Sequence, residues 1–406
     1  MRRGTRGAAC AARSLAKWES ISILQAMVPR LYTRRVRAKL KRYPAVALVG
    51  PRQCGKTTLA RGLRGLYFDM EEPGDETRLD AEWERLAGGR RLVVIDEAQQ
   101  APWVFSRLRG AIDADRRRNG RFLLLGSVSP ALTQQVSESL AGRLGRVAMT
   151  PFILPELKAS QLDDLWLRGG YPDGGILEAE MYPEWQEDYL EALATRDLPA
   201  WGLPARPQRT LRLLAMLAAV HGQPLNASQL GASLGVSHKT VLGYCDFLEG
   251  AFLIRRLPPY ATNIRKRLVK RPRLYWRDSG LLHALLHVAD LEQLYRQPWV
   301  GQSWEGFVIE QTLATLAAAG RRAQPFFFRT SDGHELDLVL DWGGALWAVE
   351  IKLTSGPSRE MVQRLHRAAD LIGAERRVLV CRIGRRIESD RLLVTPLAGW
   401  LRELMR

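Results

Sequence analysis

Three short runs of consecutive apolar residues stand out in the first part of the chain, at positions 45–49, 92–95 and 122–125. Apolar runs of this length without polar alternation are typical of strands that are buried on both faces of a parallel sheet. Helix-compatible stretches, 57–66 and 102–117, lie between them. This alternation predicts an α/β fold with a doubly wound parallel sheet, which we expect to end near Pro155.

The pattern changes after Pro155. Residues 157–225 show helical periods, above all at 184–198 and 209–220. A compact unit comes next, in which Asn226 and Ser237 can cap two helices, over 227–234 and 239–249, separated by a turn at Gly235. A strand over 252–257 then completes the outline of a winged helix-turn-helix.

A last domain is expected after a linker over residues 289–302. It begins with a helix over 303–318. Strand-like segments follow at 326–329, 335–340, 346–352 and 378–381. With 406 residues, the chain is long enough for several domains in series.

Composition and charge narrow the function classes only a little. No apolar run approaches the roughly 20 residues that span a bilayer, so we expect no membrane partner. Four scattered cysteines argue against a disulfide framework or a zinc site and favour a reducing, cytoplasmic location. Much of the net charge of +17 lies near the N-terminus. That basic leader over 1–26 resembles a transit peptide, but we favour an extension before a start at Met27.

A phosphate-binding loop follows the first apolar run directly. The motif consists of Gly50, Pro51, Arg52, Gln53, Cys54, Gly55, Lys56 and Thr57, and Thr58 continues it. It fits the pattern GxxxxGK[ST] between a strand and a helix. In such a loop, backbone N–H groups surround the β-phosphate of ATP, Lys56 reaches the β- and γ-phosphate oxygens, and the Thr57 hydroxyl binds Mg²⁺.

The second apolar run ends in two acids, Asp96 and Glu97. At the end of a strand beside a phosphate-binding loop, Asp96 is placed to hold the Mg²⁺ through water and Glu97 to polarise the attacking water. The third run ends in Gly126 and Ser127, and the serine is a candidate sensor of the γ-phosphate, although serine after glycine is also ordinary in turns.

These segments resemble the prokaryotic AAA-type ATP-binding proteins that carry a C-terminal domain of poorly defined function. The resemblance rests on GPRQCGKTT, VVIDEAQ, LLLGSVSPAL, ESLAGRLGR and PFILPEL, and on RGGYPDGG, RKRLVKRPRLYWRDSGLLHALL, SWEGFVIEQ and ALWAVEIKLT. It implies an AAA-like P-loop ATPase domain (27–155), a helical region (156–225), a winged-helix region (226–288) and an α/β nuclease-like domain (299–406). It also implies a homo-oligomer in which an arginine, for which Arg143 and Arg146 are candidates, completes a neighbour's site.

A second constellation near the C-terminus has the form of a PD-(D/E)xK nuclease core. Asp337 lies on one expected strand, and Glu350 and Lys352 share one face of the next. Two carboxylates can hold a second Mg²⁺ or Mn²⁺ that activates water, and the lysine can steady the developing charge. Glu305 on the preceding helix completes the set in similar nucleases. An exposed Glu–Lys pair on an ordinary strand is the simpler alternative.

DNA is the partner that the remaining pattern favours. Residues 255–277 contain nine Lys/Arg and no acid. Such a strip gives salt-dependent affinity for phosphates, and the helix over 239–249 can enter a major groove. The alternatives are that the strip binds an acidic protein partner or is merely solvated. The leading hypothesis is thus an AAA-type ATPase that acts on DNA, and the rival is an ATP-dependent switch that binds DNA or protein without cleaving it.

Overall fold

The computed structural model describes residues 28–127, 140, 142–260 and 271–406. The chain divides into a unit of residues 1–30 and a much larger unit of residues 31–406, which contains the elements described below. The basic leader over 1–26 lies outside the described residues, so neither of its two interpretations is tested. None of the described helices is both long enough and apolar enough to cross a membrane.

The first sheet consists of five parallel strands in the order β2-β3-β4-β1-β5. They are β1 (Ala45–Gly50), β2 (Leu66–Asp69), β3 (Val93–Asp96), β4 (Phe122–Ser127) and β5 (Leu144–Ala148). The three strands predicted from apolar runs form its centre, which confirms them. The two edge strands were not predicted, because each buries only some of its side chains and therefore keeps polar residues.

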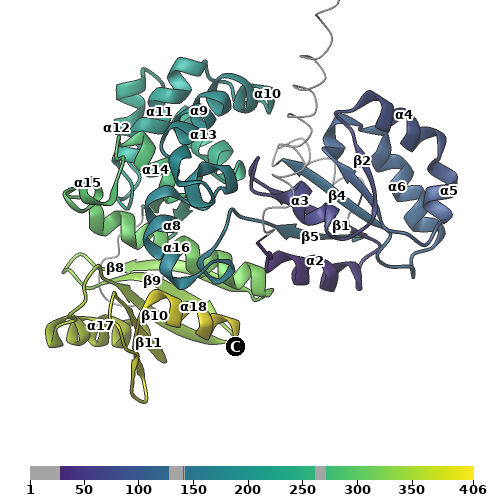
Figure 1. Cartoon of the computed structure of the whole chain (residues 1–406). Coiled ribbons are helices and arrows are strands. Elements are labelled where there is room, and N and C mark those ends of the chain that lie inside the picture. The colour runs from purple at the N-terminus through teal and green to yellow at the C-terminus, as the bar shows by residue number, and fades with distance from the viewer. Residues whose placement is uncertain (1–27, 128–139, 141, 261–270) are drawn as a thin grey trace, which may run out of the picture. The chain divides into compact units, whose positions relative to one another are not determined.

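Helices cover both faces of this sheet, as the doubly wound prediction requires (Figure 1). Val93 and Ile95 face a core shared with α4 (Pro73–Ala81), α5 (Trp83–Gly88) and α6 (Trp103–Ala114). Val46 and Leu48 face α2 (Tyr32–Leu40) and α3 (Lys56–Arg61) on the other side. Helix α3 stops at Arg61, earlier than predicted, because the chain must already turn into β2 at Leu66.

The predicted helical region is confirmed as a series of short helices. They are η2 (Leu154–Glu156), η3 (Ala159–Gln161), α8 (Leu162–Arg168), η4 (Pro172–Ile176), η5 (Ala179–Met181), α9 (Glu184–Ala192), η6 (Leu193–Asp197), α10 (Leu198–Ala200) and α11 (Pro207–Ala219). From α9 to α10 the chain is helical without a break, which holds the segment 184–200 as one continuous element.

The elements predicted for the helix-turn-helix are also present. The Asn226 side chain accepts from Gln229 N at the start of α12 (Ala227–Leu234), and that of Ser237 accepts from Thr240 N at the start of α13 (His238–Gly250). Gly235 has the left-handed backbone that the turn needs, with φ of 66°. Strands β6 (Ile254–Leu257) and β7 (Arg273–Trp276) then pair antiparallel, and α14 (Ser279–Leu285) follows.

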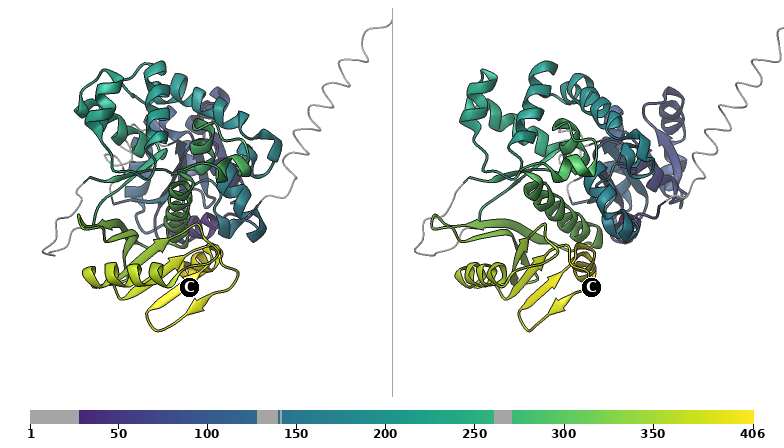
Figure 2. Two further views of the ribbon diagram at one scale, coloured as in Figure 1. Left: turned by 90° about the vertical axis from the view of Figure 1, so that its left-hand side faces the viewer. Right: turned by 60° about the vertical axis from the view of Figure 1, so that its left-hand side comes forward.

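The second sheet is mixed and has six strands in the order β12-β13-β11-β10-β9-β8. These are β8 (Ala323–Arg329), β9 (Glu335–Trp342), β10 (Ala345–Ile351), β11 (Arg376–Val380), β12 (Ile387–Glu388) and β13 (Leu392–Thr395). Its four predicted strands are confirmed. Helix α17 (Arg359–Ile372) packs on one face, and α18 (Leu397–Met405) lies near the other together with the long helix α16 (Val300–Ala319) (Figure 2).

Helix α16 links the parts of the chain to one another. It contacts α2, α14, α18 and β10, and most of its 20 residues are buried. The Trp400 indole of α18 donates to Thr312 Oγ1 of α16 at 2.9 Å, and Ala314 and Ala318 join the core of the first sheet. The expected linker over 289–302 is not a free connection, because it contains α15 (Leu291–Tyr295) and the first turn of α16.

Two buried histidines lie beside this helix, and burial disfavours their charged form. His221 Nδ1 accepts from Trp276 N at 3.1 Å. His283 Nδ1 donates to Leu167 O at 2.8 Å, and its Nε2 accepts from Ser303 Oγ at 2.7 Å. Burial lowers the pKa of His221 to about 3 and the pKa of His283 to about 4.

Acidification should therefore remove a stabilising contribution that each of these two histidines makes to the folded chain. Below the ordinary histidine pKa of 6.5, these histidines take up protons in the unfolded chain but not in the folded chain, so their contribution to stability is lost as the pH falls from 6.5 towards about 4. Each histidine contributes up to about 1.4 kcal/mol per pH unit in that window. Urea unfolding followed by tryptophan fluorescence at several pH values measures the slope.

The control is His221→Gln, which retains an acceptor for Trp276 N–H but cannot be protonated. It should have a shallower pH dependence than the natural chain. An equal pH dependence of the free energy of unfolding in the natural chain and in His221→Gln would contradict the prediction.

Candidate functional site

The loop between β1 and α3 has the backbone of a phosphate-binding loop. Gly55 has a φ of 93°, in the left-handed region that favours glycine. Gly50 lies so close to Met149 O that a Cβ atom would approach it to 2.4 Å. A side chain at Gly55 would be strained by the left-handed backbone, and a side chain at Gly50 would clash with Met149 O, so both positions require glycine.

Lys56 lies folded over this loop. Its side chain is buried, and Nζ donates to Gly50 O at 3.1 Å and to Pro51 O at 2.8 Å. Because both partners are carbonyls of the loop itself, the ammonium group lies within the curve of the backbone. Among the described residues no carboxylate forms an ion pair with Lys56, so an anion bound in the loop meets a positive charge that is not already neutralised.

The two predicted magnesium ligands are in direct contact. Thr57 Oγ1 donates to Asp96 Oδ2 at 2.7 Å, which joins the start of α3 to the end of β3. Tyr67 of β2 donates to the same carboxylate oxygen at 2.5 Å. Burial, and then the Asp96 carboxylate, raise the pKa of Tyr67 well above its usual range, so the phenol stays a donor. Sequence reasoning missed Tyr67 because it did not find β2.

Glu97 directly follows the buried carboxylate, and its backbone is strained. Its φ of 46° and ψ of 43° lie in the left-handed region, which costs a residue other than glycine about 1–3 kcal/mol. Its N–H donates to Asp96 Oδ1 at 2.9 Å, and its carboxylate accepts from Gln99. This geometry turns the Glu97 side chain toward the cavity beside the loop rather than along the strand.

That cavity has a volume of about 1180 Å³ and two walls. One wall comes from the P-loop, from Arg52 to Thr58, with Glu71 and Glu97. The other comes from the helical region, and its side chains include Trp185, Tyr189, Arg196, Asp197 and Trp201. The sequence offered no signal that residues more than a hundred positions apart would meet here.

Three further residues were predicted for this site, namely Ser127 and the two arginines Arg143 and Arg146. Strand β4 ends at Ser127, which is in register with Gly50, so the backbone of Ser127 lies beside the start of the loop. Residues 128–139, which follow, fall outside the described residues. Arg143 is paired with Asp113 of α6 at 2.8 Å. Neither Arg143 nor Arg146 lines the cavity, so within one chain neither lies at the nucleotide site.

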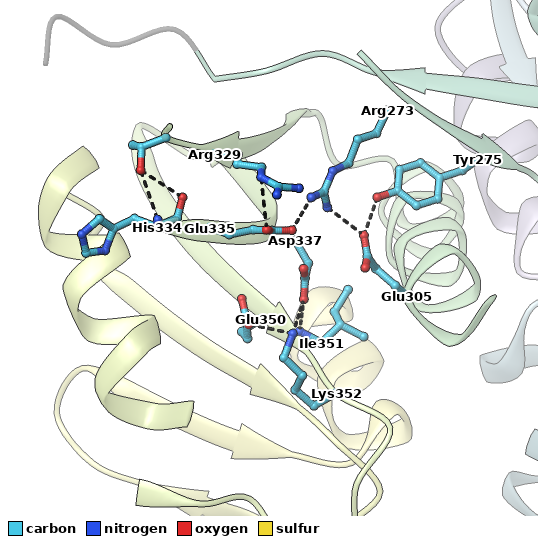
Figure 3. A network of polar contacts seen from close by, with 11 residues as sticks. Arg273, Tyr275, Glu305, Arg329, His334, Glu335, Asp337, Glu350, Ile351 and Lys352 are labelled. Atoms are coloured by element: carbon cyan, nitrogen blue, oxygen red, sulfur yellow. Dashed lines mark hydrogen bonds and ion pairs between the residues drawn. The ribbon is translucent and has the colours of Figure 1, made fainter. Parts of the chain in front are cut away.

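The predicted C-terminal residues also come together, around a smaller cavity of about 480 Å³ (Figure 3). Lys352 Nζ lies 2.7 Å from Glu350 Oε1 and 3.3 Å from Asp337 Oδ2. Asp337 Oδ2 also accepts from Ile351 N at 2.8 Å. The expectation that Glu350 and Lys352 share a face is confirmed, because the ammonium group bridges the two carboxylates.

Glu305 of α16 also lines this cavity, but its carboxylate already accepts hydrogen bonds from residues of β7. Arg273 NH1 donates to Glu305 Oε1 at 3.1 Å, and the Tyr275 hydroxyl donates to the same oxygen (Figure 3). Burial, and then the Asp337 charge, raise the pKa values of Glu305 and Glu350. Within the described parts of the chain, no three His, Cys, Asp or Glu side chains form a group that could hold a metal ion. The second metal site is therefore not supported.

The basic strip is largely neutralised where the structure describes it. Arg255 and Arg277 share the carboxylate of Glu310, Arg256 is paired with Asp246 and Glu249, and Arg273 is paired with Glu305 and Glu335. Of the Lys and Arg residues of the strip that the structure describes, Arg271 alone is exposed and forms no ion pair, and residues 261–270 lie outside the described part. The prediction of a free cationic surface is wrong for these four arginines, because residues distant along the chain supply the acids that the local sequence lacks.

Replacing Glu310 by glutamine should destabilise the protein strongly. The change leaves the buried guanidinium groups of Arg255 and Arg277 without a counter-charge, and loss of one partner from such a buried group costs about 3–5 kcal/mol. Urea unfolding measures the difference.

The matched control is Glu292→Gln, which breaks an exposed pair with Arg296 and should change the free energy of unfolding by less than about 1 kcal/mol. Equal effects of the two substitutions would contradict a special role for Glu310.

Comparison with known proteins divides the chain into three segments. Residues 42–158 match the family model described as an AAA domain. Residues 159–292 and 300–400 match two domains of unknown function, DUF8612 and DUF4143. The first match agrees with the P-loop, and the last leaves the nuclease-like expectation unconfirmed.

Two uncharacterized mycobacterial proteins are similar over most of this length. Proteins of Mycobacterium tuberculosis and Mycobacterium bovis are each 41% identical over 331 residues, which is 80% of this chain and 74% of theirs.

Two solved structures resemble the chain more distantly. A Walker-type ATPase of Pyrococcus abyssi has a TM-score of 0.43 at 16% identity, over 63% of this chain and 94% of its own. The Orc1 protein of Aeropyrum pernix in complex with DNA has a TM-score of 0.28 at 15% identity, over 65% and 95%. Scores this low add nothing to what the sequence relatives show.

Proposed function

The chain belongs to the same family as the two mycobacterial proteins and contains an AAA domain of the P-loop type, and on this premise we propose that it is a magnesium-dependent ATP hydrolase. The observation that carries the proposal is the contact between Thr57 and Asp96, at 2.7 Å, next to a lysine folded into the P-loop. A hydroxyl and a carboxylate side by side are oxygen ligands of the kind that Mg²⁺ prefers.

Each side chain of the site has a role in this proposal. Thr57 and Asp96 would hold Mg²⁺, which when bound neutralises charge on the phosphate oxygens. Lys56 can leave its carbonyl partners for the β- and γ-phosphates of ATP, and Glu97 is positioned to orient a water molecule. Tyr67 keeps Asp96 in place by donating to it.

Substitution of Lys56 and Glu97 should separate binding from hydrolysis. Lys56→Ala removes the phosphate contact, and we expect it to abolish measurable ATP hydrolysis and to weaken ATP binding by about tenfold or more. Glu97→Gln should bind ATP normally and lower kcat by about 10²-fold to 10⁴-fold. Phosphate release and isothermal titration calorimetry measure the two effects. Lys158→Ala, at an exposed lysine outside the site, is the control, and hydrolysis that persists in Lys56→Ala would rule out this site.

Action on DNA is the second part of the proposal. The two capped helices and the antiparallel pair β6–β7 support a winged-helix module, in which His238 and Lys239 are exposed at the start of α13. Glu305, Asp337, Glu350 and Lys352 line one cavity, and this grouping is the feature that favours a phosphodiesterase site. The rival is a switch in which ATP changes how these domains bind DNA or a protein.

Metal-dependent cleavage of DNA decides between these two outcomes. Plasmid, linear and branched DNA are incubated with the protein and Mg²⁺ or Mn²⁺, with and without ATP. Cleavage that Lys352→Ala lowers by about 10²-fold or more, while ATP hydrolysis is retained, would support the phosphodiesterase site. Lys158→Ala again serves as the control. Absence of cleavage under every condition would leave the switch as the function.

A further inference from the structure

Helix α2 and the residues that flank it carry many cations and no acid. Residues 30–42 contain seven Lys/Arg, and the next acid along the chain is Asp69. Acidic residues occupy 43 of the 406 positions of the chain, so several would be expected over such a length. The positive charge of this segment is therefore not balanced by its own sequence.

Three of these cations form a row on the exposed side of α2 (Figure 1). Arg34, Arg37 and Lys41 follow one another at intervals of three and four residues, which places them on one face of a helix. The opposite face holds Tyr32 and Val36, which are buried in a core of the first sheet. All three cations are exposed, and none forms an ion pair with a described acid. Unlike the paired arginines of the basic strip, they keep their charge free in the folded chain.

Packing within the chain does not explain this row. Two other cations of α2 do have contacts in the fold, since Arg35 lies against Gly320 and Lys39 Nζ lies 4.8 Å from the centre of the Tyr43 ring. Arg34 instead lies in the first turn of the helix, where the helix dipole favours acids over cations. Cations one turn apart also repel one another. The row is thus unfavourable for the helix by itself, and a negatively charged partner would offset that cost.

The positive surface continues onto the turn after α6. Asn119 Nδ2 donates to Lys41 O at 3.2 Å, so the turn lies beside the end of α2. It adds Arg117, which is exposed and has no ion pair among the described residues, and one exposed acid, Asp115, so cations remain in excess. Strand β1 begins here and ends at the P-loop, so this surface lies at the edge of the sheet opposite the nucleotide site. We call it the α2 surface, and it consists of Arg34, Arg37, Lys41 and Arg117.

We propose that the α2 surface binds the phosphate backbone of duplex DNA. The inference rests on the proposed action on DNA and goes beyond it by placing a contact surface on the ATPase domain rather than on the winged-helix module. Cations one helical turn apart suit a partner whose negative charges repeat regularly. Among the described residues, none of the exposed large apolar side chains lies on α2 or on the turn after α6. A protein or a single strand would need apolar or aromatic anchors there, whereas a duplex backbone needs charge alone.

Removal of charge tests the α2 surface. The triple variant Arg34→Ala/Arg37→Ala/Lys41→Ala should weaken binding to a fluorescein-labelled duplex of about 30 bp by about tenfold or more at about 0.1 M salt. The dependence of log affinity on log salt should also become shallower by about 2–3, because three phosphate contacts are lost. Two duplexes of unrelated sequence should show the same loss, since backbone contacts carry no sequence information. Fluorescence anisotropy measures the binding.

The matched control removes three exposed arginines from the C-terminal domain. Arg385→Ala/Arg391→Ala/Arg402→Ala lowers the net charge by the same amount and should change the affinity for the duplex by less than about threefold. Equal losses in the two triple variants would show an effect of net charge alone and would overturn the α2 surface.

The remaining outcomes separate this surface from the proposed function. If His238→Ala/Lys239→Ala abolishes duplex binding while the α2 variant retains it, the α2 surface fails and the winged-helix proposal stands. If the natural chain binds no duplex DNA, both fail, whereas ATP hydrolysis is unaffected by that result. Binding to phosphatidylserine vesicles but not to the duplex would show a membrane surface and would also overturn the proposal. Duplex binding that depends on α2 without any cleavage would support the surface and leave only the phosphodiesterase site refuted.

Discussion

The ion pairs of helix α16 are the interaction on which the arrangement of the described domains depends. Glu310 is buried and is contacted by Arg255 of β6 and Arg277 after β7, and Glu305, five residues earlier, is contacted by Arg273. Charges removed from water are tolerated only when partners of opposite sign are close, so each of these groups needs the others in place. The β6–β7 pair is thereby attached to a helix that also packs against both sheets.

Helix α16 contributes residues both to the core of the first sheet and to the C-terminal cavity. Its C-terminal part contributes Ala314 and Ala318 to the core of the ATPase sheet, and its N-terminal part presents Glu305 to the C-terminal cavity. Tightly packed elements transmit small displacements because cores deform little. A helix that packs against both sheets is thus a rigid connection between them.

The nucleotide site shows how far local reasoning extends. The P-loop, Thr57 and Asp96 could all be predicted, because their chemistry depends on short spacings after apolar strands. Tyr67 could not, because β2 is an edge strand with a weak apolar pattern. The second wall of the cavity, with Arg196 and Asp197, could not be predicted either, because no local pattern records which helix packs over the loop.

The basic strip is a feature for which local sequence gave a wrong prediction. Residues 255–277 contain nine Lys/Arg and no acid, yet four of these arginines form ion pairs in the folded chain. Local composition cannot reveal this, because the neutralising carboxylates come from α13, α16 and β9. By itself the sequence determined the central strands of the first sheet, the capped helices and the phosphate-binding motif, since those depend on neighbouring residues. Which charges stay free, which helix closes the nucleotide cavity and which carboxylates meet were decided only by tertiary packing, because they depend on contacts between residues far apart along the chain.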